Sequence, residues 1–107
     1  MKNEEYKEEL IKSINNGGFT DKLEIGVIGA ISNFFDKSPY KDQKWYLPEH
    51  EFLFKKNALE VCKELSLKFN PERGSNAFAY IVQIIKCSFA STHLNIVVTE
   101  WKQKQKI

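Results

Sequence analysis

Apolar residues in the first third of the chain recur every three or four positions, which is the spacing of one face of an α-helix. The pattern predicts one helix over residues 3–15 and a second over residues 21–35. The glycine pair at 17–18 is expected to end the first helix, because glycine takes the left-handed conformation of a helix C-cap without strain. Either Thr20 or Asp21 is expected to cap the second helix.

Residues 36–48 form a polar and aromatic segment with two prolines, and this composition predicts a loop between helices. Pro48 suits the first turn of a third helix, since its missing N–H needs no partner there. Apolar residues of this third helix recur at helical spacing as far as Phe69. The Asn-Pro-Glu-Arg-Gly sequence at 70–74 then predicts a sharp turn.

A fourth helix is expected after this turn, capped by Ser75 or Asn76 and reaching about Thr92. Its residues are apolar almost all round, which is typical of a central, buried helix. Residues 94–107 stay open between strand and helix, because their β-branched residues favour a strand while their flanks could extend the helix. The whole pattern predicts an all-α fold, a compact bundle of four to five helices.

Two glycines, Gly26 and Gly29, fall inside the second predicted helix. Each costs about 1 kcal/mol relative to alanine at such a position. The simplest explanation is a tolerated weakness of the helix. We favour the alternative that another helix approaches closely where these side chains are missing.

The chain has 107 residues, of which 42% are hydrophobic and 28% charged, and this suits a single folded domain. Residues 1–18 hold its N-terminal helix and residues 94–107 form a basic tail. The apolar runs are short, so we expect no transmembrane span and no membrane partner. The polar N-terminus does not resemble a secretory signal. Cys62 and Cys87 lie in no disulfide or zinc pattern, and both are expected to be small buried residues of a cytoplasmic protein.

The formal net charge of +2 is unevenly distributed along the chain. Residues 1–36 carry seven acidic and four basic side chains, whereas residues 37–107 carry seven acidic and twelve basic ones. This asymmetry is compatible with an anionic partner for the C-terminal part. Arg73 is the single arginine, which leaves little scope for bidentate base readout by arginine.

The sequence contains no recognisable catalytic motif. His50 and His93 have neither a metal-binding context nor a nucleophile at a suitable spacing, and His93 is expected to be exposed near a helix end. No glycine-rich phosphate loop and no two-metal arrangement of acidic residues is present. We therefore expect a binding protein and not an enzyme, with no catalytic residue, cofactor or metal.

The stretch from Ala58 to Ala90 carries a resemblance to a known family. A helix, a Phe-Asn-Pro-Glu-Arg-Gly turn and a helix that opens with Phe-Ala-Tyr resemble region 2 of bacterial sigma factors. The likeness is closer to the small late-transcription sigma factors of T-even-type phages, whose turn and helix read approximately F-D-P-E-K-x-x-N-P-F-A-Y-x-x-Q. The resemblance covers residues 20–91. The residues that match the pattern without a gap are Phe69, Pro71, Glu72, Asn76, Phe78, Ala79, Tyr80 and Gln83.

The resemblance implies a two-sided transcription module in the cytoplasm of an infected bacterial cell. One side would be the third helix, bound to the clamp helices of the largest subunit of core RNA polymerase. Because the clamp helices of the family's partner are basic, acidic side chains here would set the docking register by charge complementarity. The residues that the resemblance places at this contact are Asn57, Glu60, Lys63 and Glu64.

The other side would be the fourth helix, facing promoter DNA and directing the recognition and opening of late promoters. Melted bases stack on aromatic side chains for roughly 1–3 kcal/mol each, and Tyr80 is best placed for this by the motif, with Phe78 second. Lysines of the helix and tail would neutralise phosphates. The residues expected on this DNA-binding side are Phe78, Tyr80, Gln83, Lys86, Lys102 and Lys104.

Two alternatives stay open at this point. The phage family continues into an arginine- and lysine-rich segment, whereas residues 91–94 of this chain contain no arginine. This departure favours a sigma-mimicking inhibitor or modulator that binds polymerase without promoter contacts. The third possibility is a helical protein-interaction adaptor unrelated to transcription, because Phe69, Phe78 and Tyr80 would be core residues in any helical hairpin.

Overall fold

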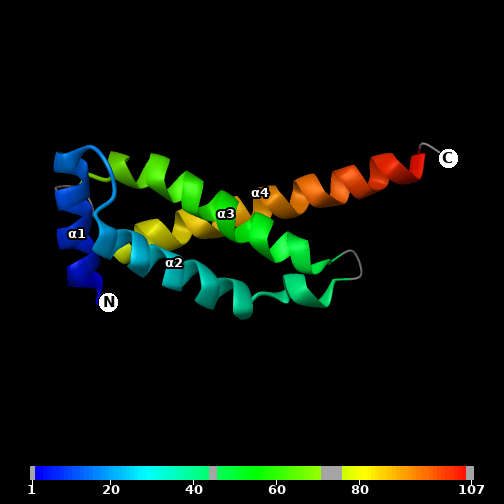
Figure 1. Ribbon diagram of the computed structural model, residues 1–107, viewed down its shortest axis with the longest axis horizontal. Helices are drawn as coiled ribbons and strands as arrows, with labels where there is room; N and C mark the ends of the chain where they lie inside the picture. Colours follow the sequence, from blue (N-terminus) through cyan, green and yellow to red (C-terminus); the bar gives the residue numbers. More distant parts are fainter. Residues whose placement is uncertain (1, 44–45, 71–75, 106–107) are drawn as a thin grey trace.

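The computed structural model describes residues 2–43, 46–70 and 76–105. Four α-helices follow one another along this part of the chain, namely α1 (Asn3–Asn16), α2 (Asp21–Asp36), α3 (Pro48–Leu65) and α4 (Ala77–Gln105). Two short 3-10 turns accompany them, η1 (Pro39–Asp42) after α2 and η2 (Ser66–Lys68) after α3. The predicted all-α bundle is therefore confirmed (Figure 1).

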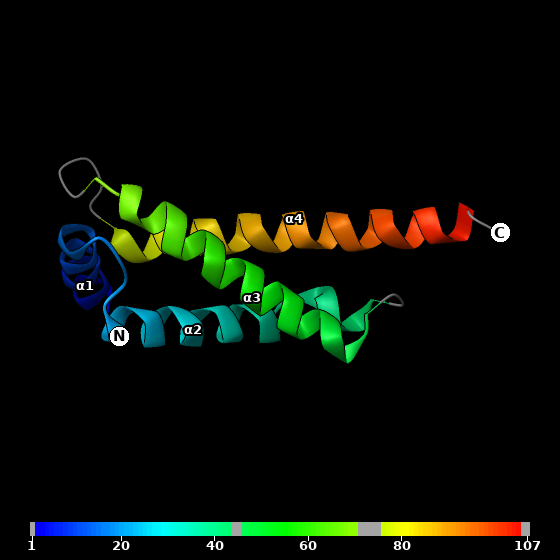
Figure 2. The same ribbon diagram turned by 45° about the horizontal axis from the view of Figure 1, so that its top comes forward.

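The three longer helices run along the molecule, and α1 crosses one end of them (Figures 1 and 2). Helix α3 contacts both α2 and α4, and its contact with α4 is the most extensive in the fold. The molecule measures 53 × 22 × 22 Å. This elongation follows from α4, whose 29 residues give a rod about 44 Å long. The C-terminal end of α4 extends past the other helices (Figure 1).

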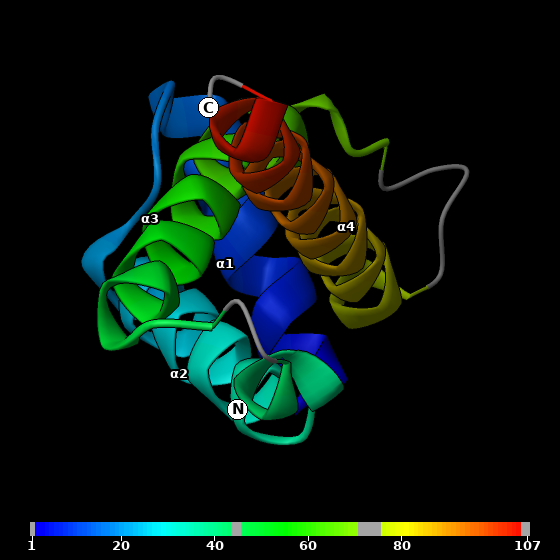
Figure 3. The same ribbon diagram turned by 90° about the vertical axis from the view of Figure 1, so that its right-hand side faces the viewer.

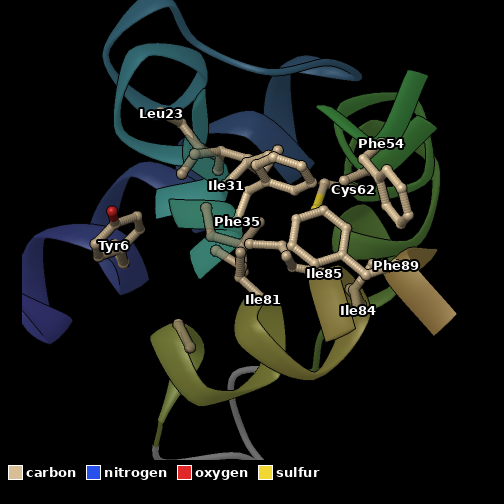
Figure 4. Packing of buried hydrophobic residues seen from close by; sticks show 14 of the residues in the cluster. Tyr6, Leu23, Ile31, Phe35, Phe54, Cys62, Ile81, Ile84, Ile85 and Phe89 are labelled. Atoms are coloured by element: carbon tan, nitrogen blue, oxygen red, sulfur yellow. The ribbon is translucent and has the colours of Figure 1, made fainter. Parts of the chain in front are cut away.

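Aromatic rings from α2, α3 and α4 meet at the centre of the core (Figure 4). The ring centroid of Phe35 lies 5.4 Å from that of Phe54 and 5.9 Å from that of Phe89, and all three side chains are buried. Tyr40 of η1 stacks on Phe54 at 4.7 Å, so the segment expected as a loop also covers the core. The ring of His93 lies 5.3 Å from Tyr40. The expectation that His93 is exposed near a helix end is therefore wrong, since it is half-buried well inside α4.

Helix α1 lies across the end of the bundle (Figure 3). Hydrogen bonds and a ring contact of Asn3 and Tyr6 help to hold it there. The Tyr6 hydroxyl donates to the carbonyl oxygen of Gly26 at 3.0 Å. The backbone N–H of Phe78 donates to Oδ1 of Asn3 at 3.0 Å, and the rings of Tyr6 and Phe78 lie 4.9 Å apart. These contacts join the first helix to α2 and to the start of α4.

Three helix boundaries follow the signals in the sequence, whereas α3 ends at Leu65, before the Phe69 to which its apolar spacing extends. Gly17 ends α1 in the left-handed conformation, with φ of 77°, as predicted. Thr20 is the cap of α2, because its Oγ1 accepts a hydrogen bond from the N–H of Leu23 at 3.2 Å. Asn76 caps α4 in the same way, its Oδ1 accepting from the N–H of Ala79 at 2.9 Å.

Two expectations about helix interiors are decided by the structure. Helix α4 continues without interruption to Gln105. The described part of residues 94–107 is therefore helical and not a strand. The buried side chain of Ile96 shows that this extension still packs on the bundle. The predicted close approach at Gly29 is wrong, because no atom lies within 4 Å of a Cβ built there. Gly26 differs in that its carbonyl accepts the bond from Tyr6.

Glu9 is buried at the junction of α1 and α2 although it can carry a charge. Its Oε1 accepts a hydrogen bond from Oγ1 of Thr20 at 2.9 Å, and its Oε2 lies 3.1 Å from Nζ of Lys12. The buried hydroxyl of Ser13 accepts from the N–H of Thr20 at 3.0 Å and donates to the Glu9 carbonyl. The bond from Thr20, followed by that from Lys12, lowers the pKa of Glu9 below its ordinary value of 4.5.

We predict that Glu9→Gln weakens the fold at neutral pH and that its deficit shrinks in acid. A pKa lowered by folding adds stability above the unfolded-state pKa, and this contribution is lost as the pH falls through the lower folded-state pKa. The test is urea unfolding of both proteins at several pH values between neutrality and about pH 3, below the ordinary glutamate pKa. Glu8→Gln, an exposed neighbour on the same helix, is the control. A constant difference between wild type and Glu9→Gln across that range would contradict the prediction.

Candidate partner-binding surfaces

The four residues expected to contact polymerase all lie on α3, but they do not share one face. The Nδ2 of Asn57 donates to Oγ1 of Thr92 on α4 at 3.1 Å. The Nζ of Lys63 lies 2.7 Å from Oε1 of Glu24 on α2. These two side chains therefore link α3 to its neighbours on opposite sides. Of the four residues, Asn57 and Lys63 are the ones whose described side-chain contacts join α3 to another helix.

Glu60 and Glu64 are exposed on α3 and lie one helical turn apart. Residues at positions i and i+4 are neighbours on a helix surface, so the two carboxylates form an acidic pair on the outside of the bundle. Glu60 also borders a shallow groove of about 310 Å³ between α3 and α4, most of whose residues are polar. The other residues that line this groove are Asn57, Val61, Cys87, Ser88, Ser91, Thr92 and Asn95.

A second groove, between α2 and α3, is almost purely apolar and was not predicted from the sequence. Its volume is about 270 Å³, and its residues are Ile28, Ile31, Ser32, Phe52, Lys55, Lys56 and Leu59. The side chain of Phe52 is 70% exposed, compared with 59% for Trp101. Phe52 does not belong to the helical spacing of Phe54, Ala58 and Cys62. This departure is the sequence signal that could have identified Phe52 as exposed. An exposed apolar groove is a candidate interaction surface.

Both aromatic residues expected to stack on DNA bases are engaged in packing at the start of α4. Phe78 is half-buried against Tyr6. The ring of Tyr80 lies 5.2 Å from Phe69, and its hydroxyl donates to the carbonyl oxygen of Leu65 at 3.2 Å. Tyr80 thus ties α4 to the end of α3.

The polar residues expected on the DNA-binding side lie on the solvent side of α4 where their side chains are described. Gln83 and Lys86 are exposed, and Nε2 of Gln83 is 3.6 Å from Sγ of Cys87. Lys102 is exposed near the other end of the helix, about 24 Å from Lys86 along the axis. Lys104 belongs to α4, but its side chain lies outside the described residues.

The turn that carries much of the family motif, residues 71–75, lies outside the described residues, with Pro71 and Glu72 in it. The flanking motif residues are described. Phe69 is buried, Asn76 caps α4, and Tyr80 contacts Phe69 across the turn. Of the described motif residues, Phe69 and Tyr80 therefore pack together at the end of the α3–α4 pair.

The two cysteines differ in environment, contrary to the expectation that both are buried. Cys62 is buried in the core, and burial raises the pKa of its thiol from 9.0 to about 12. Cys87 is exposed on α4. No group of three or more histidine, cysteine or acidic side chains within the described ranges is placed to hold a metal ion.

One described helix bears on the expectation of no membrane-spanning segment. Residues Ala77–Gln103 of α4 are long and apolar enough to cross a bilayer, and among the described residues theirs is the one helix of this kind. However, 39% of the most apolar window is buried inside the fold. A core helix of a soluble protein passes the same test, so this feature alone is weak evidence for a membrane.

We predict that only Cys87 reacts quickly with a thiol reagent at pH 8. The thiolate is the reactive form, and Cys62 is both buried and held protonated. Ellman's reagent should modify one thiol per native chain and two in denaturant. Cys87→Ser should abolish the fast reaction, whereas Cys62→Ala should leave it unchanged. Fast modification of two thiols in the native protein would contradict the burial of Cys62.

Comparisons of this chain with protein-family models, with curated proteins and with solved structures find no match.

Proposed function

We propose that this protein is a sigma-like transcription factor of a phage, which binds the clamp helices of bacterial core RNA polymerase and directs the recognition and opening of late promoters. The observation that carries the proposal is the gapless match of residues 69–83 to the late sigma pattern. Its described aromatic members, Phe69, Phe78 and Tyr80, occupy the end of the α3–α4 pair.

The α3–α4 pair carries exposed residues suited to each of the two expected contacts. The helices run in opposite directions beside each other, so the exposed side of α3 and the outer side of α4 belong to one packed pair (Figures 1 and 2). Glu60 and Glu64 present negative charge on α3, which suits basic clamp helices. Gln83 and Lys86 present a donor group and a positive charge on α4, which suit DNA. A module of this kind performs no reaction itself.

A second candidate function is favoured by the packing of the aromatic residues. Tyr80 bonds the Leu65 carbonyl and Phe78 packs on Tyr6, so neither ring is free to receive a base without rearrangement. Together with the missing arginines at residues 91–94, this favours a modulator that occupies the sigma site on polymerase and lacks promoter contacts.

Binding to core polymerase tests both candidates. We predict that the full chain binds core enzyme and that the double variant Glu60→Lys, Glu64→Lys binds about tenfold more weakly, equivalent to about 1.4 kcal/mol. The physical reason is repulsion between the new lysines and a basic clamp surface. Glu8→Lys changes an exposed acid on α1 and should leave the affinity unchanged. The absence of binding by wild type would overturn both candidates and leave the unrelated adaptor.

Transcription from late promoters separates the two candidates. For a sigma factor, Tyr80→Ala should reduce open-complex formation by roughly 5- to 150-fold, corresponding to the 1–3 kcal/mol of one base–aromatic stack. Tyr80→Phe retains the ring and should retain most of the activity. Affinity for core enzyme serves as the control for folding in both variants. A modulator would support no initiation and would inhibit transcription by the host sigma factor with or without the Tyr80 substitution.

A further inference from the structure

The shallow groove that Glu60 borders continues along α3 and α4 toward the C-terminal end of α4. It shares Asn95 with a second hollow, of about 430 Å³, which lies where the N-terminal end of α3 and the C-terminal half of α4 diverge (Figures 1 and 2). The exposed side chains of Leu47 and Leu53 line this second hollow. The two hollows thus form one channel, the α3–α4 groove, with exposed apolar side chains in its larger part.

A buried hydroxyl faces the α3–α4 groove without a partner. Ser88 of α4 lines the first hollow and is only 6% exposed, and its hydroxyl has no hydrogen-bond partner among the described residues. Thr92, one turn further along α4, differs because its hydroxyl accepts a bond from Asn57. A buried polar group without a partner costs free energy, and a polar or charged group bound beside it would recover that cost. The position of Ser88 therefore indicates that something polar binds in this groove.

The charge of the α3–α4 groove is negative. Glu49, Glu60 and Glu100 line it, whereas no lysine or arginine does so in the part of the chain that the structure describes. None of the three carboxylates forms an ion pair within residues 2–43, 46–70 and 76–105. The lysines of α3 lie on its other side, toward α2, where they line the apolar groove or pair with Glu24. These lysines are Lys55, Lys56 and Lys63.

These features specify the chemistry of the occupant. The negative charge attracts cationic groups and repels phosphates, which excludes nucleic acid. The exposed leucines require apolar side chains beside the cationic ones. Glu49 and Glu60 lie about 16 Å apart along the axis of α3, the length of about three helical turns. A basic amphipathic helix of this length meets all these requirements.

We propose that the α3–α4 groove binds a basic amphipathic helix along its length, with Glu49 and Glu100 as well as Glu60 facing the cationic side chains of that helix. The inference rests on the proposed function for the identity of the partner, which makes the helix one of the clamp helices of core polymerase. It changes the expected contact in one respect. The partner lies between α3 and α4, so that α4 contributes Glu100 and the hydroxyl of Ser88 to a contact otherwise made by α3 alone.

Binding to core RNA polymerase tests the two added carboxylates. We expect the double variant Glu49→Lys, Glu100→Lys to bind core enzyme about tenfold more weakly than wild type, and we expect added salt to narrow the difference. The matched control is Glu4→Lys, Glu8→Lys, which reverses two exposed acids of α1, one of them also in a first helical turn. This control should bind as wild type does. Circular dichroism checks that both variants keep their helices.

Ser88→Ala tests the buried hydroxyl. The variant should bind core enzyme roughly 2- to 10-fold more weakly, the range of one hydrogen bond. It should unfold at the same urea concentration as wild type or a higher one, because the free chain loses no hydrogen bond. A purely structural role for Ser88 would instead lower the stability of the free chain.

Alkylation of Cys87 tests where the partner lies, because this exposed cysteine lines the first hollow. Bound core enzyme should slow the reaction of Cys87 with N-ethylmaleimide by about tenfold, as followed by mass spectrometry, since the reaction requires access to the thiol. A cysteine placed on the exposed side of α2 by Ile25→Cys should react equally fast in the free chain and in the complex.

The outcomes separate this inference from the proposed function. If wild type binds core enzyme but Glu49→Lys, Glu100→Lys binds equally well, or Cys87 stays as reactive as in the free chain, the inference is overturned and the proposed function stands. A wild-type chain that does not bind core enzyme would overturn both. Protection of Cys87 in the concentrated chain without core enzyme would assign the groove to a second copy and overturn the inference as well.

Discussion

The packing of α3 against α4 around the rings of Phe35, Phe54 and Phe89 is the interaction on which the rest of this structure depends. Burying a side chain of this size contributes about 1.5–3 kcal/mol, and three of them meet at one point. The bond between Asn57 and Thr92 joins the same two helices. Because the inner sides of both helices are committed to this core, their outer sides are the surfaces left for partners.

The packing of Tyr80 at the end of the α3–α4 pair bears on the choice between the two proposed functions. Releasing Tyr80 costs its hydrogen bond to Leu65, about 0.5–1.5 kcal/mol, and its contact with Phe69, about 0.5–1.5 kcal/mol. If the chain acts as a sigma factor, promoter opening is therefore coupled to a rearrangement at the end of α3.

The outer side of α4 changes character along its length. Its N-terminal half carries Gln83 and Lys86, whereas its C-terminal half carries exposed apolar side chains, among them Leu94, Val97 and Trp101.

The sequence by itself determined the helices and most of their ends. Apolar spacing located all four helices, and local chemistry placed Gly17, Pro48 and Asn76 at their boundaries. These features depend on backbone preferences and on neighbours a few residues away, which a sequence displays directly.

Only the tertiary structure decided which side of each helix is left to a partner. Cys62 and Cys87 have the same chemistry, yet one is buried and one exposed, because they lie on different sides of the α3–α4 contact. Tyr80 matches a DNA-binding motif, yet its hydroxyl bonds a carbonyl fifteen residues away. Leu94 and Ile96 are equally apolar, and only the position of the neighbouring helices buries Ile96 and leaves Leu94 in water. Burial depends on contacts between distant segments, and periodicity within one helix does not specify them.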